Sequence, residues 1–316
     1  MNFDDYRFRP HSLVNIMSGV PKPLTANQEN TLNDLLKKHN DPDAKKLTEK
    51  QIQTLGGLIE RKNAKYILTD GAKKYLEKLV FECLVKRSSK ITAKYLDKGL
   101  QKEDVAITTY SNVLNKLLLK NKERRKNKYL DGECDNKQSK IRDVKASWSY
   151  VTFPITDNTI KNKGYIWQLD GYMDLWELKE SELVYVLVDT PDKLLNDEIR
   201  NLDRKHNILD HEGNVRNDSG KELIIETVCN HIFTLEGLKA FCENSSNVKL
   251  EWFEGVFVEI PEEMRVKVFQ HSYCETRNKQ MKEMIVLARK YMNEVLFSIP
   301  DNYKKLIELK NSLKAA

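Results

Sequence analysis

Residues 132–148 read Gly-Glu-Cys-Asp-Asn-Lys-Gln-Ser-Lys-Ile-Arg-Asp-Val-Lys-Ala-Ser-Trp, which is the pattern of a short β-hairpin. Across residues 139–148, the two-residue period of a strand places Ile141, Asp143 and Lys145 on one face. If residues 138–140 form the hairpin tip, Asp135 lies directly opposite Asp143. The tip lacks the glycine that such turns favour, so this register is a hypothesis. It would bring two carboxylates within reach of one shared cation.

Two acids beside a lysine are unfavourable to bring together unless a further charge neutralises them. A hard divalent cation such as Mg²⁺ is the usual partner of an all-oxygen site. The alternative is an exposed hairpin with ordinary surface charges, because Asp-x-Lys is a common tripeptide. Taken alone, this stretch favours the exposed hairpin. A metal site would need support from other motifs in the chain.

The composition is typical of a soluble globular protein, with 40% hydrophobic and 32% charged residues among 316. A net charge of +6 permits a polyanionic partner without requiring one. Five scattered cysteines without a Cys-x-x-Cys pair predict a reducing compartment and no structural zinc or iron–sulfur cluster. The N-terminus has no apolar leader, and the longest apolar run, residues 183–188, is too short to cross a bilayer. These features predict a cytoplasmic protein without a membrane partner.

The N-terminal part is predicted to be helical. Residues 1–23 are interrupted by three prolines, with a short helix candidate at 13–17. The pattern Leu-Thr-x-x-Gln begins at residues 24 and 47, and in each copy a Thr-x-x-Gln capping box precedes helical apolar spacing. A third helix is expected at 70–86, so a packed group of helices precedes the hairpin.

A longer amphipathic helix is predicted over residues 96–118. Its apolar positions are Leu96, Leu100, Ile107, Tyr110, Leu114 and Leu117. Glu103 falls on the same line, which places a carboxylate on the core side, where a lysine or a metal would have to satisfy it. A glutamate at the edge of the stripe that reaches solvent fits the spacing equally well.

Seven basic residues lie within residues 116–128, from the end of this helix toward the hairpin. Such runs are usually a solvated face, but one that leads into an acidic hairpin could also hold phosphates. They are Lys116, Lys120, Lys122, Arg124, Arg125, Lys126 and Lys128.

The second half of the chain predicts an α/β core. A loop at 152–157 precedes a helix at 159–178, on which Gln168 and Tyr172 share a face because they are four residues apart. Residues 182–190 form a nearly continuous apolar run, the signature of a strand covered on both faces. Helices are expected within 192–247, broken by a polar loop near 210–220. Two further strands at 252–260 and 265–269, a long helix at 275–296 and a Lys-rich helical tail complete the prediction.

In their order along the chain, these motifs resemble those of the PD-(D/E)XK nuclease superfamily. The similarity is greatest to its phage-type branch, which includes lambda exonuclease, the YqaJ-like viral recombinases and the RecB nuclease domain. Singly the motifs are weak, but five in the expected order are specific. They are Gly99-Leu-Gln-Lys-Glu103, Gly132-Glu-Cys-Asp135, Asp143-Val-Lys145 with the following Ala-Ser-Trp148, Gln168-Leu-Asp-Gly-Tyr172, and Leu183-Val-Tyr-Val-Leu-Val-Asp-Thr-Pro191. Cys134 replaces the proline that is usual before the first acid. The second acid is Asp143, where many relatives have Glu.

The resemblance implies a restriction-endonuclease-like fold, with a small mixed sheet flanked by helices over residues 91–316, a helical region at 1–90 and a long C-terminal helix. It also implies a catalytic set and a metal site. The catalytic set is Glu103, Asp135, Asp143, Lys145, Gln168 and Tyr172. One or two Mg²⁺ ions, which Mn²⁺ can replace, would bind to Glu103, Asp135, Asp143 and the backbone carbonyl of Val144.

Roles for individual residues follow from the same resemblance. Lys145 would orient the attacking water or help to deprotonate it, and Gln168 and Tyr172 would position the DNA strand. Tyr172 fits equally well as a residue that packs its helix on the sheet. Arg9 and Ser12 are candidates to hold a DNA 5′-phosphate, and the cations Lys120, Lys122, Arg124, Arg125 and Lys126 are candidates to bind DNA.

The function implied is an Mg²⁺-dependent DNA exonuclease that resects linear duplex DNA for phage-type recombination or repair. Its partners would be DNA, a single-strand-annealing protein and further copies of the chain, in the host cytoplasm if a phage encodes it. A structure- or site-specific endonuclease is an alternative, because the same core serves both activities. A non-catalytic DNA-binding or virion protein that retains the nuclease fold is the other alternative.

Overall fold

The computed structural model describes residues 1–89, 92–245 and 247–305. The chain divides into two compact units, Met1–Ser88 with Glu275–Ala316 and Ser89–Cys274. Among the residues that the structure describes, no helix combines the length and apolarity needed to cross a bilayer.

The first unit is helical, as predicted. Thr25 and Thr48 each form a complete capping box with the glutamine three residues later, so both sequence repeats begin a helix where expected. The sequence-based division placed the last long helix with the second domain, whereas in the structure it packs on α3 within the first unit. The helices are α1 (Ala26–Asn40), α2 (Glu49–Lys62), α3 (Asp70–Val85) and α9 (Glu275–Ser298), preceded by the 3₁₀ turns η1 (Pro10–Asn15) and η2 (Met17–Gly19).

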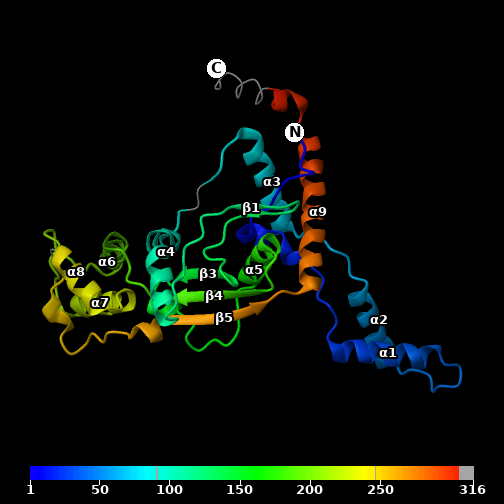
Figure 1. Cartoon of the computed structure of the whole chain (residues 1–316), viewed down its shortest axis with the longest axis horizontal. Coiled ribbons are helices and arrows are strands. Elements are labelled where there is room, and N and C mark those ends of the chain that lie inside the picture. Colours follow the sequence, from blue (N-terminus) through cyan, green and yellow to red (C-terminus); the bar gives the residue numbers. More distant parts are fainter. Residues whose placement is uncertain (90–91, 246, 306–316) are drawn as a thin grey trace. The chain divides into compact units, whose positions relative to one another are not determined.

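The second unit contains a mixed three-stranded sheet in the order β3-β4-β5, whose strands lie side by side (Figure 1). β3 (Ile141–Ala146) is parallel to β4 (Glu180–Val186), and β4 is antiparallel to β5 (Val266–Ser272). A parallel pair needs a crossover connection, which the helix α5 (Lys163–Trp176) supplies. A two-stranded ribbon of β1 (Arg125–Lys126) and β2 (Asp131–Gly132) precedes the sheet. The predicted fold class, a small mixed sheet flanked by helices, is confirmed.

The two faces of the sheet are covered by different helices. α4 (Lys94–Val113) packs Ala106, Ile107 and Tyr110 onto the face that carries Val144 and Val184. α5 covers the other face, where Asp143 is in register with Leu183 of β4 and with Phe269 of β5. The sheet therefore lies between two helices, and its central strand β4 is buried on both sides, as its apolar run predicted.

The apolar stripe predicted for α4 is wrong in part. Leu96 and Leu100 are exposed, because the packing of the helix on the sheet comes from its second half. Leu114 and Leu117 lie beyond the end of the helix at Val113 and are also exposed. In the first half, the fully buried side chain is that of Lys98, which the stripe did not include.

A small helical lobe completes the second unit. It consists of α6 (Asp192–His206), α7 (Asp218–His231) and α8 (Leu235–Asn244), which agree with the helices predicted on either side of a polar loop. The strand predicted at 252–260 is wrong: the chain forms the 3₁₀ turn η4 (Leu250–Phe253) and then an irregular segment. Its aromatic residues pack on the core of this lobe, which accounts for the apolar pattern without a sheet. The 3₁₀ turns η3 (Tyr150–Thr152) and η5 (Glu262–Arg265) lie on either side of the lobe in sequence.

Lys98 is a fully buried lysine next to the end of the hairpin segment. Its Nζ donates to the backbone oxygen of Trp148 at 3.0 Å and lies 5.5 Å from the ring centroid of Phe233. Burial lowers the pKa of Lys98 to about 7, although the carboxylate of Asp189 partly offsets this effect. Folding therefore buries a charge that the unfolded chain would keep in water.

We expect Lys98→Met to raise the free energy of unfolding by about 1–4 kcal/mol at pH 7, because it removes this buried charge while keeping the volume. Above pH 7 the folded protein releases the proton while the unfolded lysine keeps it up to about pH 10, so the wild type gains stability as pH rises. The advantage of the variant should then shrink between pH 7 and pH 10 in denaturant titrations. The exposed Lys239→Met is the control, and a pH-independent gain or a loss of stability would contradict the prediction.

Candidate active site

The hairpin has the register that the sequence predicted. Asn136 and Arg142 exchange both backbone hydrogen bonds, at 3.2 Å and 2.8 Å, as an isolated antiparallel bridge. The next residue pair outward is Asp135 and Asp143, which this register places directly opposite each other. The hairpin therefore brings the two acids together although its tip has no glycine.

Asp143 lies close enough for its charge to affect the ionisation of Asp135. One oxygen of Asp135, Oδ2, accepts the backbone N–H of Val144 at 2.7 Å. Burial raises the pKa of Asp135 above its usual range, and the negative charge of Asp143 raises it further. Such a pair gains strongly from a nearby positive charge.

Lys145 supplies one positive charge on the same face of β3. Its Nζ lies 2.7 Å from Oδ2 of Asp143 and 5.5 Å from the ring centroid of Tyr165 on α5. Burial lowers the pKa of Lys145, but the charges of Asp143 and Asp135 outweigh this effect, and the net pKa is raised above the usual value. Lys145 therefore keeps its proton at neutral pH.

The helix α5 adds the two residues predicted from its spacing. Gln168 is buried, and its amide donates to Oδ1 of Asp143 at 2.9 Å. The same Nε2 atom lies 3.5 Å from the hydroxyl of Tyr172. Burial, followed by the charges of Asp143 and Asp135, raises the pKa of Tyr172, so its hydroxyl stays protonated and can donate a hydrogen bond.

Asp143 retains one acceptor that protein hydrogen bonds leave unused. Its Oδ2 is buried and, although Lys145 is near, it accepts no hydrogen bond of standard geometry from the described residues. A buried carboxylate oxygen of this kind, beside a second carboxylate, fits a hard divalent cation in charge and donor type.

Glu103 stands apart from this pair. Its Oε1 forms an ion pair with Lys120 at 3.3 Å, and its side chain is 25% exposed. A lysine therefore neutralises this carboxylate, which was one of the predicted alternatives. Glu103 still contributes to the raised pKa of Asp135 through its charge. Within the described ranges, no three His, Cys, Asp or Glu side chains converge as a metal site, so the predicted ligand set stays a prediction.

A buried polar network lies beneath the acids, on the opposite face of the sheet. Arg142 donates to Oε2 of Glu182 on β4 at 2.8 Å and to the side-chain oxygen of Asn136 at 2.8 Å. Glu182 also accepts from Tyr110 of α4 at 2.9 Å and from Gln270 of β5 at 3.0 Å. Arg142 thus links the hairpin to the sheet next to both acids. We did not predict this network, although charged residues inside otherwise apolar strands are the signal that could have revealed it.

The predicted DNA-binding cations have different surroundings. Lys120 pairs with Glu103 and Asp104, Arg124 with Asp131, and Arg125 with Glu123. Lys122 and Lys126 are exposed and have no carboxylate partner among the residues that the structure describes. Arg9 and Ser12 belong to the first unit, where the hydroxyl of Ser12 donates to the backbone oxygen of Arg9 at 2.7 Å. Their predicted role at a 5′-phosphate stays a prediction.

A small mixed sheet flanked by helices is the arrangement that the resemblance to PD-(D/E)XK nucleases predicted, and in the structure Asp143 and Lys145 lie on its edge strand β3. The structure is similar to that of a phage-related exonuclease from Haemophilus somnus 129PT, with a TM-score of 0.57 and 19% sequence identity. This similarity covers 94% of this chain and 97% of the other. The chain therefore has the fold of that exonuclease, and the predicted resemblance is confirmed at the level of the fold.

A second solved structure, an alkaline exonuclease from Laribacter hongkongensis, has a TM-score of 0.42 and 9% identity. That similarity covers 78% of this chain and 88% of the other, and it is too distant to support an argument. No protein-family model and no curated protein matches the sequence.

We expect Arg142→Ala to lower the free energy of unfolding by about 3–5 kcal/mol, because it removes the buried charged partner of Glu182. The matched control is Lys140→Ala, which removes a more exposed partner of the same carboxylate. Its effect should be below about 1 kcal/mol. Denaturant titrations of the variants measure both values, and equal losses would show that Arg142 has no special position in the network.

Proposed function

We propose that this chain is a metal-dependent deoxyribonuclease that hydrolyses phosphodiester bonds of DNA. The observation that carries the proposal is the convergence of Asp135, Asp143 and Lys145 on one site, with Gln168 bound to Asp143. Two opposed carboxylates, a protonated lysine and an amide donor form a suitable set for phosphoryl transfer with a divalent cation. The fold similarity alone would not establish an activity.

Asp135, Asp143 and the carbonyl oxygen of Val144 would hold the cation, and Glu103 would contribute if it is released from Lys120. A bound Mg²⁺, or Mn²⁺ in its place, would lower the pKa of a water molecule and offset charge on the phosphate. The raised pKa of Asp135 supports this assignment, because a second positive charge would relieve the repulsion between the acids.

The remaining residues would act by position and charge. Because Lys145 stays protonated, we assign it to orient the water and to stabilise charge on the phosphate, rather than to accept a proton. Gln168 holds Asp143 through its amide, and the protonated hydroxyl of Tyr172 would donate to a phosphate oxygen. The ring of Tyr165, next to Lys145, limits where the ammonium group can move.

For the substrate, we propose the ends of linear duplex DNA, resected for recombination or repair. One solved structure that shares the fold is that of a phage-related exonuclease, which supports this choice over an endonuclease. Lys122 and Lys126 would contact DNA phosphates, because neither is neutralised by a described carboxylate. Arg9 and Ser12 at the 5′-phosphate, a single-strand-annealing partner and a homo-oligomer belong to the same proposal.

The proposal predicts that linear duplex DNA is degraded in Mg²⁺ while closed circular DNA of the same sequence survives. Chelation should abolish the degradation, and Mn²⁺ should restore it, because the acids need a cation to act on a phosphate. Gel analysis of both substrates over time measures these outcomes. Cleavage of the closed circle would favour an endonuclease, and binding of DNA without any cleavage would favour a non-catalytic protein.

The control for this experiment is a pair of lysine variants. Lys145→Ala should lower the rate by about 10²–10³-fold, since it removes the protonated group from the site. Lys239→Ala removes one exposed positive charge from α8 and should leave the rate unchanged. Equal rates for the two variants would refute the role assigned to Lys145.

A further inference from the structure

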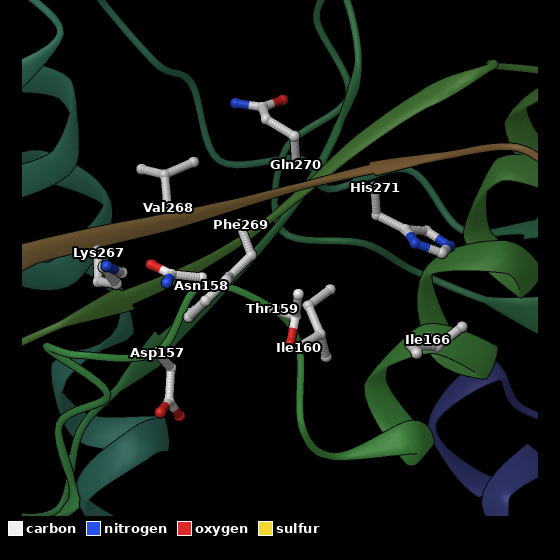
Figure 2. A pocket seen from close by; sticks show the side chains of 10 residues that line it. All are labelled: Asp157, Asn158, Thr159, Ile160, Ile166, Lys267, Val268, Phe269, Gln270 and His271. Atoms are coloured by element: carbon white, nitrogen blue, oxygen red, sulfur yellow. The ribbon is translucent and has the colours of Figure 1, made fainter.

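A cavity of about 560 Å³ lies beside the edge strand β5 (Figure 2). One side is formed by residues 267–271 of β5, and the other by the loop at 157–160 and Ile166 of α5. Figure 2 shows Thr159 and Ile160 below the strand and His271 pointing toward α5. Its volume lies within the range of small-ligand sites, roughly 300–1,000 Å³.

Part of this cavity shares the sheet face of the candidate active site. Lys145 of β3, Tyr185 of β4 and Lys267 of β5 are in register, and side chains in register lie on one face. Two strand spacings separate Lys145 from Lys267, a distance of about 10 Å. This is the rise of about three stacked nucleotides in one DNA strand.

The lining combines apolar walls with one uncompensated positive charge. Ile160, Ile166 and Phe269 supply apolar surface. Lys267 donates to the backbone oxygen of Ile155 at 3.1 Å and has no carboxylate partner among the described residues. Since an ammonium group has three donors, Lys267 can bind an anion without losing this contact.

The other titratable side chains that line the cavity already have partners. Asp157 forms an ion pair with Lys161 of the same loop. His271 is bound to the buried Asp170 of α5 at 2.8 Å. Among the described residues that line the cavity, Lys267 is therefore the side chain whose charge has no acidic partner.

We propose that this cavity binds one nucleotide unit of a DNA strand, one to three positions from the bond at the active site. Lys267 would contact the phosphate, the base would lie against Ile160 and Ile166, and Asn158 and Thr159 would face its polar edge. The identity of the ligand rests on the proposed function. The cavity would hold the strand at the opposite edge of the sheet from Asp143 and Lys145 and so favour substrates long enough to reach it.

An extended peptide paired with β5 is the rival occupant. The alternation of β5 with β4 directs the backbone groups of Val268 and Gln270 toward the free edge. A lysine on an edge strand is, however, a usual device against pairing with another strand. The unneutralised charge, on the sheet face of the acids, therefore favours a phosphate-bearing ligand.

The test is the salt dependence of binding to a ten-nucleotide oligothymidylate, measured by fluorescence anisotropy without metal so that no cleavage occurs. Lys267→Gln keeps a donor for the oxygen of Ile155 but removes the charge, and Lys267→Arg keeps the charge. We expect Lys267→Gln to weaken binding about 3- to 10-fold and to reduce the slope of log affinity against log salt by about 0.7, the value for one phosphate contact of a single strand. Lys267→Arg and the exposed control Lys239→Gln should retain the wild-type slope.

An unchanged slope in Lys267→Gln would overturn the inference, and so would a wild-type protein that does not bind the oligonucleotide. Thermal unfolding of each variant shows whether a loss of binding comes from misfolding. If Lys267→Gln misfolds, the double variant Ile160→Ala/Ile166→Ala serves as the test instead, and it must weaken binding without changing the slope. Because the assay omits cleavage, its outcome is separate from that of the proposed function. If the wild type cleaves DNA but Lys267→Gln keeps the wild-type slope, the cavity proposal alone is refuted. If Lys267→Gln has a reduced slope but the wild type cleaves no DNA, the nuclease proposal alone is refuted.

Discussion

The antiparallel pairing of Asn136 with Arg142 is the constraint on which the candidate site depends. It sets the register that places Asp135 opposite Asp143, and the side chain of Arg142 reinforces it by donating to Asn136. The same guanidinium binds Glu182 of β4, so the hairpin is attached to the sheet next to both acids. Buried ion pairs contribute little net stability, but losing one partner is strongly destabilising, which suits a contact that fixes geometry.

The charge balance on the other face of the sheet connects this geometry to chemistry. Two carboxylates face one protonated lysine, and the pKa of Asp135 is raised first by burial and then by the charge of Asp143. A site arranged in this way is unfavourable for folding and favourable for binding a cation. The cavity at Lys267 extends the same face by two strands and would give a DNA strand a second point of attachment.

Local patterns predicted the parts of the structure that local interactions determine. The Thr-x-x-Gln boxes located two helices, the alternation around Asp143 predicted the strand, and a hairpin tip at residues 138–140 predicted the register. The failures came from tertiary context: Leu96 and Leu100 fit a helical stripe but extend past the sheet that α4 covers, and residues 252–260 alternate like a strand but pack on helices. The partner of Arg142 could not be predicted, because Glu182 lies 40 residues away and meets it through strand pairing.

In the proposed site, Asp135 and Asp143 share a divalent cation. Crystals grown with Mn²⁺ and measured near the manganese absorption edge test it directly, because the anomalous signal locates the ion without reference to activity. We expect a peak between the two carboxylates, next to the backbone of Val144, in the wild type, and its loss in Asp143→Asn. A wild-type crystal with no peak there, or a peak that persists in Asp143→Asn, would contradict it.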